Sequence, residues 1–587
     1  MSGTFGAFGV ARLGIYAAQS GLDVTGNNIT NINTQGYTRQ RLDLVSLSSS
    51  ASDKYSSIYN VRIGQGVLTA GVVQLRDPGL DLQYRGASAN VGSASQKLEG
   101  LNSIAGILDE VGKGSTDEDQ DDGVILRQMN DLRDLISKAL TNGIDGYDGM
   151  IRESADALCT LFNQYAKDLE DLQVKYETQL EQNVTEVNNI LKNIRDLNET
   201  IREADIRGDA ALELRDERNR QLDKLSTYMK IDVTYSMEDV GAGLQVEKLT
   251  VSLGSGNKNV LIDGVYGTQF SQELLERNPD FPAVDPNNPY LDNNGLPTAD
   301  PEQAKKLDNT NYSLTLGPLL NDRGEKLDAA DFGHDLGDNE LYGSLQSLRE
   351  LLTESGEYST EDYVTNVDDG AGSKRGIPYY RKALDNLAQE FAEQMNALNA
   401  QTTPPDEPID GAGNLFSIGS NSDVAMSDNG TPLDPTDDFS LITAANISVS
   451  KSWNDGNVSM IASRYPNASS GDNSNLAAFL DVFNKTHQFK PGDLVTDAVG
   501  KDSPFEGTFE DMLIHIQSTL GEDQMSTTAV LNNYSITQNE LYMDRESVSG
   551  VDLNDEATNL MVYQKAYTAA CRLMTTLEEA LDALMAM

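Results

Sequence analysis

Few side chains in this 587-residue chain have the types and spacing that enzymatic chemistry requires. The three histidines, His334, His487 and His515, stand far apart, and neither an HExxH pair nor a nearby cysteine completes a metal-ligand set. Isolated histidines of this kind are usually structural or exposed. The two cysteines, Cys159 and Cys571, both lie in helical patterns, which predicts buried, reduced thiols and excludes a disulfide framework.

Nucleotide, nucleophile and cation motifs are also incomplete. The chain has no GxSxG turn and no GxxxxGK[ST] loop, and the Gly-Gln-Gly at 64–66 lacks the rest of a dinucleotide fingerprint. An EF-hand beginning at Asp117 would need Gly at its sixth position and Glu at its twelfth, where the sequence has Asp122 and Gln128. We therefore predict a solvated acidic turn at 117–123, and no catalytic residue, cofactor site or metal site. The 92 carboxylates are so numerous that acid pairs arise by chance, so an enzyme based on carboxylates stays an alternative.

The most distinctive polar run lies near the N-terminus. Residues 27–40 read Asn-Asn-Ile-Thr-Asn-Ile-Asn-Thr-Gln-Gly-Tyr-Thr-Arg-Gln. Asparagine side chains compete for backbone hydrogen bonds and should end a preceding helix, while Gly36 permits a turn. After the turn, the alternation from Tyr37 to Leu44 predicts a strand.

Both ends of the chain have the periodicity of amphipathic helices. In residues 8–29 and 553–584, apolar side chains recur at alternating spacings of three and four. Small residues such as Ala18 and Gly21 would let another helix approach closely. Either stripe alone could belong to an ordinary core helix, but the matched ends predict that these helices pair as a coiled coil and serve assembly. The predicted assembly interface consists of Ile15, Ala18, Leu22, Asn27, Asn28, Asn31, Asn33, Gly36, Tyr37, Arg39, Gln40, Leu560, Tyr563, Tyr567, Met574, Leu577, Leu581 and Leu584.

The order of patterns along the chain predicts an α+β multidomain fold. A long helix at 151–207 carries a heptad-like seam, and further strands are expected at 58–63 and 67–75. The middle of the chain is rich in turns and short strands, apart from a helix at 379–399. We predict a terminal helical coiled-coil domain (1–60 with 546–587), a helical rod domain (61–235 with 505–545) and a β-rich acidic outer region (236–504) of two domains.

Composition limits the classes of partner. A chain of 587 residues is too long for one hydrophobic core. With 92 Asp and Glu against 44 Lys and Arg, the net charge of -48 argues against nucleic acid and anionic membranes as partners. No apolar run approaches the roughly 20 residues that span a bilayer. Residues 1–8 lack both Lys and Arg and a continuous apolar core, so we do not expect a cleaved secretory signal.

The asparagine-rich run resembles the N-terminal signature of the axial proteins of the bacterial flagellum. Most members of that family have Ala at the place of Thr30, and often Pro or a polar residue at the place of Gln35. The continuation Tyr-Thr-Arg-Gln-Arg at 37–41 and the Ser-Gly pair at 549–550 resemble the subunits that join hook to filament more than hook or rod proteins. Further similar stretches are 215–222 with Leu225, 376–380 and 549–567. The resemblance covers about 1–235, 340–400 and 505–587.

This resemblance implies a structural subunit that assembles with itself into a helical tube, with paired terminal helices lining the inner channel and the other domains outside. The implied partners are further copies of the chain, the hook protein, the second junction protein and an export chaperone that holds the C-terminal helix. The implied location is the extracellular flagellum, reached unfolded through the flagellar type III pathway. Another axial protein, hook or flagellin, and an axial scaffold that carries an enzymatic insert remain as alternatives.

Overall fold

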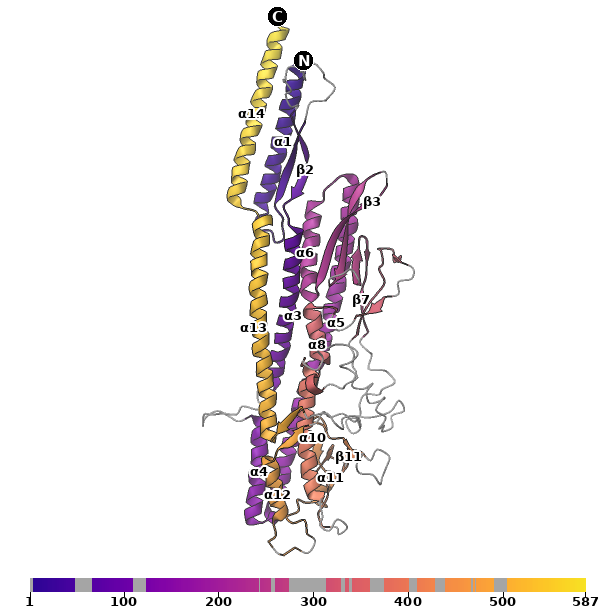
Figure 1. Cartoon of the computed structure of the whole chain (residues 1–587), viewed down its shortest axis with the longest axis vertical. Coiled ribbons are helices and arrows are strands. Elements are labelled where there is room, and N and C mark those ends of the chain that lie inside the picture. The colour runs from indigo at the N-terminus through magenta and orange to yellow at the C-terminus, as the bar shows by residue number, and fades with distance from the viewer. Residues whose placement is uncertain are drawn as a thin grey trace.

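The computed structural model shows an elongated molecule with both chain ends at the same end (Figure 1). It describes residues 4–47, 66–108, 123–241, 243–254, 259–273, 313–328, 333–336, 340–358, 374–400, 409–427, 439–465, 468–469, 471–489 and 504–586. The strand predicted at 58–63 and the acidic residues 117–122 lie outside these ranges. Among the described helices, none is both long and apolar enough to span a bilayer.

Helices dominate the described part of the chain, and short strands interrupt them. The helices are α1 (Thr4–Thr30), α3 (Pro78–Leu108), α4 (Val124–Asn142), α5 (Asp148–Arg207), α6 (Leu212–Tyr228), α8 (Gly343–Thr353), α10 (Ile377–Ala400), α11 (Lys451–Asn454), α12 (Ser474–Asn484), α13 (Phe509–Ser549) and α14 (Leu553–Met585), with short 3-10 turns η1 (Ile144–Gly146) and η2 (Gly356–Tyr358). The strands are β1 (Gln40–Ser46), β2 (Val67–Gln74), β3 (Ile231–Asp239), β4 (Gln245–Leu253), β5 (Asn259–Asp263), β6 (Tyr266–Gly267), β7 (Phe270–Glu273), β8 (Ser313–Leu316), β9 (His334–Asp335), β10 (Phe416–Ile418), β11 (Met426–Ser427), β12 (Phe439–Ser440), β13 (Ile447–Val449), β14 (His487–Phe489) and β15 (Phe505–Gly507).

The longest helix is α5, which has 60 residues and at 1.5 Å per residue is about 90 Å long. Its existence and extent confirm the predicted long helix. The predicted seam drifts, however, because a straight helix has 3.6 residues per turn and a heptad assumes 3.5. A heptad seam that starts at Tyr176 includes Asn183 and Leu197, but the structure leaves these two half-buried and buries Val184 and Asn198 instead.

Helices from distant parts of the sequence pack along this rod. α13 lies along α3, and α8 and α10 pack against α5 (Figure 1). Leu101, Phe162, Leu348 and Phe391, one from each of α3, α5, α8 and α10, have no exposed surface and belong to one apolar cluster. The range 505–545, which was predicted to belong to the helical rod domain, begins with a strand, because Phe505–Gly507 forms β15. Thr508 then caps α13 through a reciprocal capping box with Asp511.

The strands form small antiparallel sheets beside the helices. The order of the larger sheet is β3-β4-β5-β6, and β7-β8-β9 forms another. Helices and small sheets together confirm the α+β multidomain class. The range 236–504 nevertheless includes α8, α10 and α12, which pack on rod helices, so the predicted domain boundaries stay a prediction.

At the end that holds both termini, α1 lies between two neighbours. α14 packs on one side of α1, and the antiparallel hairpin β1–β2 packs on the other (Figure 1). We call α1, α14 and this hairpin the terminal unit. The side-by-side packing of α1 and α14 agrees with the predicted pairing of the ends, whereas coiled-coil geometry stays a prediction.

We expect Leu101→Ala to lower the free energy of unfolding by about 2–5 kcal/mol, because the lost side chain leaves a cavity in the rod core. Chemical denaturation followed by far-UV circular dichroism measures this change. Leu82→Ala on the same helix is the matched control, since Leu82 is exposed and its loss should change stability by no more than about 0.5 kcal/mol. Equal effects of the two substitutions would contradict the packing of α3 described above.

Candidate assembly interface

Small residues allow α1 and α14 to approach each other closely. A Cβ atom on Gly21 would lie 2.5 Å from the ring of Tyr563, and one on Gly14 would lie 3.7 Å from the Cβ of Ala570. Seven residues forward on α1 thus correspond to seven residues back on α14, so the helices run antiparallel. Ala11 on the same helix is buried as well.

The predicted interface residues differ in how far the isolated chain covers them. The buried ones are Ala18, Asn28 and Gln40; the half-buried ones are Ile15, Leu22, Asn27, Asn31, Tyr37, Arg39, Tyr563, Met574, Leu577 and Leu581; the exposed ones are Asn33, Gly36, Leu560, Tyr567 and Leu584. The buried members hold the terminal unit together within one chain. A role of the set in contacts between chains stays a prediction.

Asn28 connects the end of α1 to the start of β1. Its side-chain amide donates to the carbonyl of Gln40 at 2.9 Å, and its side-chain oxygen accepts the Gln40 N–H at 3.0 Å. The hydroxyl of Tyr37 donates to the same oxygen at 2.8 Å. The side chain of Asn28 therefore bonds the strand as a neighbouring peptide group would, which explains why a buried asparagine ends this helix.

The other asparagines fold the turn that follows. Asn31 donates to the backbone and side-chain oxygens of Asn27 at 3.0 and 2.8 Å, and Thr34 donates to Asn31 at 3.1 Å. Gly36 has a φ of +80°, a conformation that side chains with a Cβ rarely adopt. The prediction that the asparagines end the helix and Gly36 makes the turn is confirmed.

Arg39 fastens this segment to the corner between α13 and α14. Its backbone N–H donates to the carbonyl of Ser549 at 2.8 Å. Its guanidinium donates to Glu556 at 2.8 Å and to Asp555 at 3.4 Å. Because Glu556 is almost fully buried, removal of Arg39 would leave a buried carboxylate without its ion-pair partner, which should be costly.

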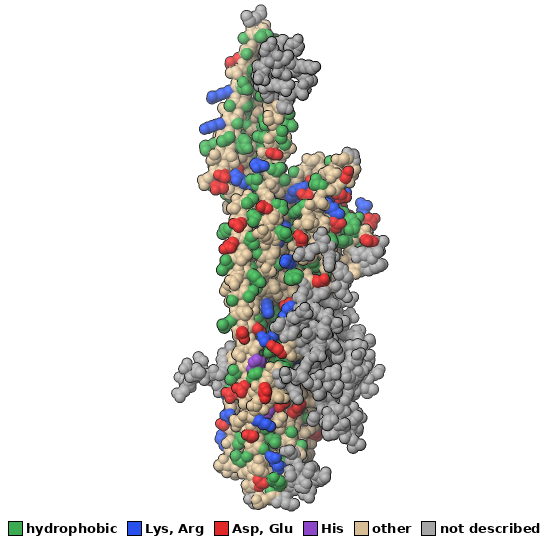
Figure 2. Space-filling view, viewed as in Figure 1, with side chains coloured by type: hydrophobic (Ala, Val, Ile, Leu, Met, Phe, Trp, Pro, Cys, Tyr) green, Lys and Arg blue, Asp and Glu red, His purple; other side chains and the backbone are tan. Residues whose placement is uncertain are grey.

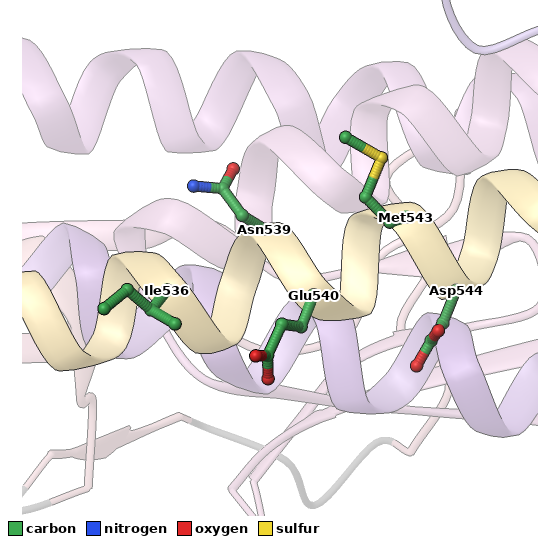
Figure 3. A pocket seen from close by; sticks show the side chains of 5 residues that line it. All are labelled: Ile536, Asn539, Glu540, Met543 and Asp544. Atoms are coloured by element: carbon green, nitrogen blue, oxygen red, sulfur yellow. The ribbon is translucent and has the colours of Figure 1, made fainter.

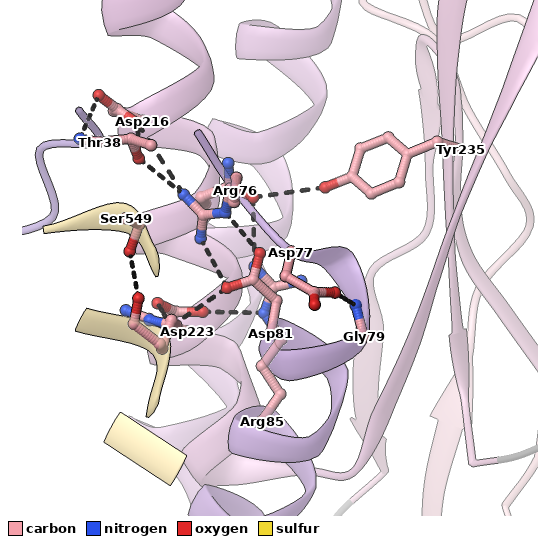
Figure 4. Close-up of polar contacts among 12 residues, drawn as sticks. Thr38, Arg76, Asp77, Gly79, Asp81, Arg85, Asp216, Asp223, Tyr235 and Ser549 are labelled. Carbon is pink, nitrogen blue, oxygen red and sulfur yellow. Dashed lines mark hydrogen bonds and ion pairs between the residues drawn. The ribbon is translucent and has the colours of Figure 1, made fainter. Parts of the chain in front are cut away.

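A cluster of charged side chains lies beside Ser549 at this corner (Figure 4). Thr38 donates both its hydroxyl and its N–H to Asp216, at 2.6 and 3.1 Å, and its oxygen accepts from Arg76 at 3.2 Å. Arg76 also binds Asp81 through two nitrogens. We call this group the joint cluster, with the members Thr38, Arg76, Asp81, Arg85, Asp216, Asp223 and Arg545.

The same cluster reaches α13. Arg85 donates to Asp223 at 2.8 Å, and Arg545 donates to the second oxygen of Asp223 at 2.7 Å. Arg545 also lies 3.6 Å from Asp81, with its guanidinium over the ring of Tyr84. The joint cluster thus ties α3, α6, α13 and the segment after α1 together at one point.

Burial sets the protonation of this region. It raises the pKa of the Asp216 carboxyl, although the hydrogen bonds from Thr38 and the charge of Arg76 act in the opposite direction. Burial and nearby carboxylates raise the pKa of Tyr37, so its hydroxyl keeps the proton that it donates to Asn28.

The joint cluster was not predicted from the sequence, although a signal for it was present. Asp216, Asn219 and Asp223 recur at spacings of three and four on one face of α6, and all of them bond to other elements. Charged residues at helical spacing are usually exposed, so this pattern indicates burial only when an opposite set is found. Arg76 and Arg85 supply that set, because Arg76 pairs with Asp216 and Arg85 pairs with Asp223.

The residues considered for catalysis do not gather in the described part of the chain. His487 contacts Glu390 and the carbonyl of Val482, and His515 stacks on Phe505. The side chain of His334 lies outside what the structure describes. No group of three or more His, Cys, Asp or Glu side chains among the described residues could hold a metal ion. A shallow depression on α13 is formed by one helix alone (Figure 3); its lining residues are Ile536, Asn539, Glu540, Met543 and Asp544.

The two cysteines differ in environment. Cys159 is buried as predicted, and burial raises the pKa of its thiol, which keeps it protonated. Cys571 is only half-buried, so the prediction of two buried thiols was wrong for this position. It follows Ala570 on α14 and so lies beside the seam rather than in it.

Comparison with known proteins connects this architecture to a biological assembly. A family described as the flagellar hook-associated protein FlgK helical domain matches residues 127–288, and the flagellar basal body rod FlgEFG protein C-terminal family matches residues 545–587. A protein named flagellar hook-associated protein 1 from Bacillus subtilis is 25% identical, over 99% of this chain and 98% of its own length. The resemblance to flagellar hook-associated protein 1 is confirmed.

Other proteins of the same name are similar to this chain over a comparable length. Proteins of the same name from Salmonella typhimurium and Escherichia coli are 24% and 23% identical, each over 98% of both chains. The solved flagellar hook junction protein FlgK from Burkholderia pseudomallei is 19% identical with a TM-score of 0.37, over 58% of this chain and 47% of that one. The matches to flagellar hook-associated protein 1 span nearly the whole chain and support a structural role at the junction of hook and filament.

Cysteines introduced at positions 14 and 570 should form a disulfide, because the Cβ distance of 3.7 Å is close to the mean of about 3.8 Å in disulfides. Adding Gly21→Ala to this pair should lower the yield several-fold, since the new Cβ would overlap the ring of Tyr563. Mass spectrometry of the oxidised full-length protein, carrying Cys571→Ser, measures the yield. Gly26→Ala is the control, because no atom lies within 4 Å of its Cβ position. An equal yield for the two variants would contradict the seam.

The raised pKa of Asp216 predicts a pH dependence. Because the folded pKa exceeds the unfolded value of about 3.9, the stabilisation it gives is fully present below that pH and is lost as pH rises through the folded pKa. The unfolding free energy of the natural protein minus that of Asp216→Asn should therefore decrease from about pH 4 upward and then level off. Denaturation curves across this range measure the difference. A difference that is flat, or that increases with pH, would contradict the burial of this carboxyl.

Proposed function

We propose that this chain is a structural subunit of the bacterial flagellum and forms the junction between hook and filament by helical self-assembly. The observation that carries the proposal is the similarity to flagellar hook-associated protein 1 over 98–99% of the chain. The geometry of the terminal unit supports the assembly step, for two physical reasons.

The first reason is uncovered apolar surface on α14. Val562 is 57% exposed and Leu584 is 70% exposed, although α14 is part of a packed helix pair. Further exposed apolar side chains on this helix are Leu553, Leu560, Met561, Tyr567, Leu573 and Met585. Apolar side chains are spread over the visible face of the terminal unit (Figure 2). So many exposed apolar side chains on one helix are typical of a surface that contacts another protein.

The second reason is the distribution of charge. The chain has a net charge of -48, yet residues 557–577 contain no carboxylate, and residues 4–42 contain one, Asp23. Copies of a strongly acidic molecule repel one another, and this repulsion is weakest where carboxylates are missing. The terminal unit is therefore the part of the molecule through which copies can approach most easily.

The finer features of the proposal follow the resemblance. The terminal helices would line the inner channel, and the turn-rich region 236–504 would lie largely outside the tube. The subunit would contact the hook protein on one side and the second junction protein on the other. An export chaperone would cover the apolar surface of α14 before delivery through the flagellar type III pathway.

Deletion of the gene in the organism that carries it tests the junction role. We expect cells that keep their hooks, lack filaments and release unpolymerised flagellin, because the filament would have no base on which to grow. Electron microscopy of the cells and analysis of the medium for flagellin measure these outcomes. Reintroduction of the natural gene is the control and should restore filaments.

Two other results would contradict the proposal. Loss of hooks would identify a hook or rod protein instead. Normal filaments on the deleted cells would exclude a structural role at the junction.

A further inference from the structure

The hairpin β1–β2 has an apolar outer face that none of the described residues covers. Its inner face packs on α1, where Leu42 is buried. On the outer face, Val45 pairs with Leu68, and the two side chains are 50% and 47% exposed. Val73 adds a further exposed apolar side chain. Isolated hairpins are marginally stable in water, and exposed apolar hairpins tend to pair with other chains.

A second uncovered apolar face runs along α14. Tyr563 and Ala570 point toward α1, whereas a neighbouring stripe on the same helix does not. Its members recur at spacings of three, four and seven and are all exposed: Val562, Ala566, Ala569, Leu573, Ala580 and Leu584. We call these residues the second stripe of α14.

These two faces cannot meet within one chain. α1 lies between the hairpin and α14, and a helix with its side chains is about 10 Å across (Figure 1). The terminal unit thus presents two different apolar faces, one on its hairpin and one on its C-terminal helix. Contacts between unlike faces generate rings and helical filaments, whereas a contact of one face with itself closes a dimer.

We propose that the outer face of hairpin β1–β2 packs against the second stripe of α14 in a neighbouring copy of this chain. The proposal rests on the proposed function, since it names the contact by which self-assembly proceeds. Charge permits this pairing although the chain is strongly acidic. The hairpin face carries Asp43 and Arg41, whose charges offset each other, and the α14 surface between residues 557 and 577 carries Lys565 and Arg572 with no carboxylate, so no two carboxylates meet across the contact.

Substitution on the hairpin tests this contact in full-length protein supplied to cells that lack the gene. We expect Leu68→Asp to reduce the amount incorporated into hook–filament structures at least tenfold, because the carboxylate would be buried in the contact without a partner. Met237→Asp is the matched control, since Met237 is 65% exposed and lies on β3, which is not part of the terminal unit. Both variants should unfold at the same temperature as the natural protein, because neither side chain is buried in the monomer.

Disulfide formation tests which faces meet. In a Cys571→Ser background, Leu68→Cys would be combined with Val562→Cys in one set and with Leu573→Cys in another, to allow for the axial offset between copies. Oxidised assemblies of at least one double variant should contain a ladder of covalent multimers, and each single variant should stay monomeric. A disulfide requires Cα atoms within about 7 Å, so the pair cannot close within one chain across α1.

The outcomes separate this inference from the proposed function. If Leu68→Asp incorporates as well as Met237→Asp, or if oxidised assemblies contain only monomers and dimers, the hairpin contact is wrong while self-assembly stands. If the natural protein itself is missing from hook–filament structures, the proposed function is wrong, and the hairpin contact with it.

Discussion

The backbone hydrogen bond from Arg39 to the carbonyl of Ser549 joins the segment between α1 and β1 to the corner where α13 of the rod meets α14 of the terminal unit. One segment leaves α1, the other turns from α13 into α14, and neither has a long loop that would let it adjust independently. The side chain of Arg39 also forms an ion pair with the buried Glu556, which stabilises the same corner. With these contacts, the seam of α1 and α14 has one register and the chain ends share one end of the molecule. The joint cluster beside them transmits that placement to α3, α6 and α13.

The long helices could be predicted from the periodicity of apolar residues in the sequence. The short helices could not, because their burial depends on contacts with distant parts of the chain. Apolar stripes at helical spacing identified α1, α5 and α14, because long amphipathic helices have the clearest sequence signal. α8 and α12 were not predicted, since 11-residue helices between turn-rich stretches have too few turns to show a period. Both helices are buried against the rod. The turn-rich composition of the middle region therefore did not predict that parts of this region pack on the rod helices.

The candidate interface was predictable in part for a similar reason. Asparagine and glycine have strong local preferences, for ending helices and for turns. In the structure Asn28 lies at the end of α1 and bonds to the backbone of Gln40, and Gly36 adopts a positive φ in the turn. Asp216 and Arg76 have local patterns that fit exposed helices and turns equally well. Only their mutual distance in the fold shows that they form one buried cluster. The buried charges described for the rod are paired, whereas the described residues leave apolar side chains of the terminal unit exposed. This contrast supports a molecule whose rod is complete as a monomer and whose ends are completed by other copies.

The central claim is that assembly covers the terminal unit. Hydrogen exchange of backbone amides, compared between the free full-length chain and isolated hook–filament structures, tests it most directly. The account predicts that residues 553–585 exchange much more slowly in the assembled state, while the core of α5 around Phe162 exchanges at the same slow rate in both. Equal exchange of α14 in the two states would contradict it.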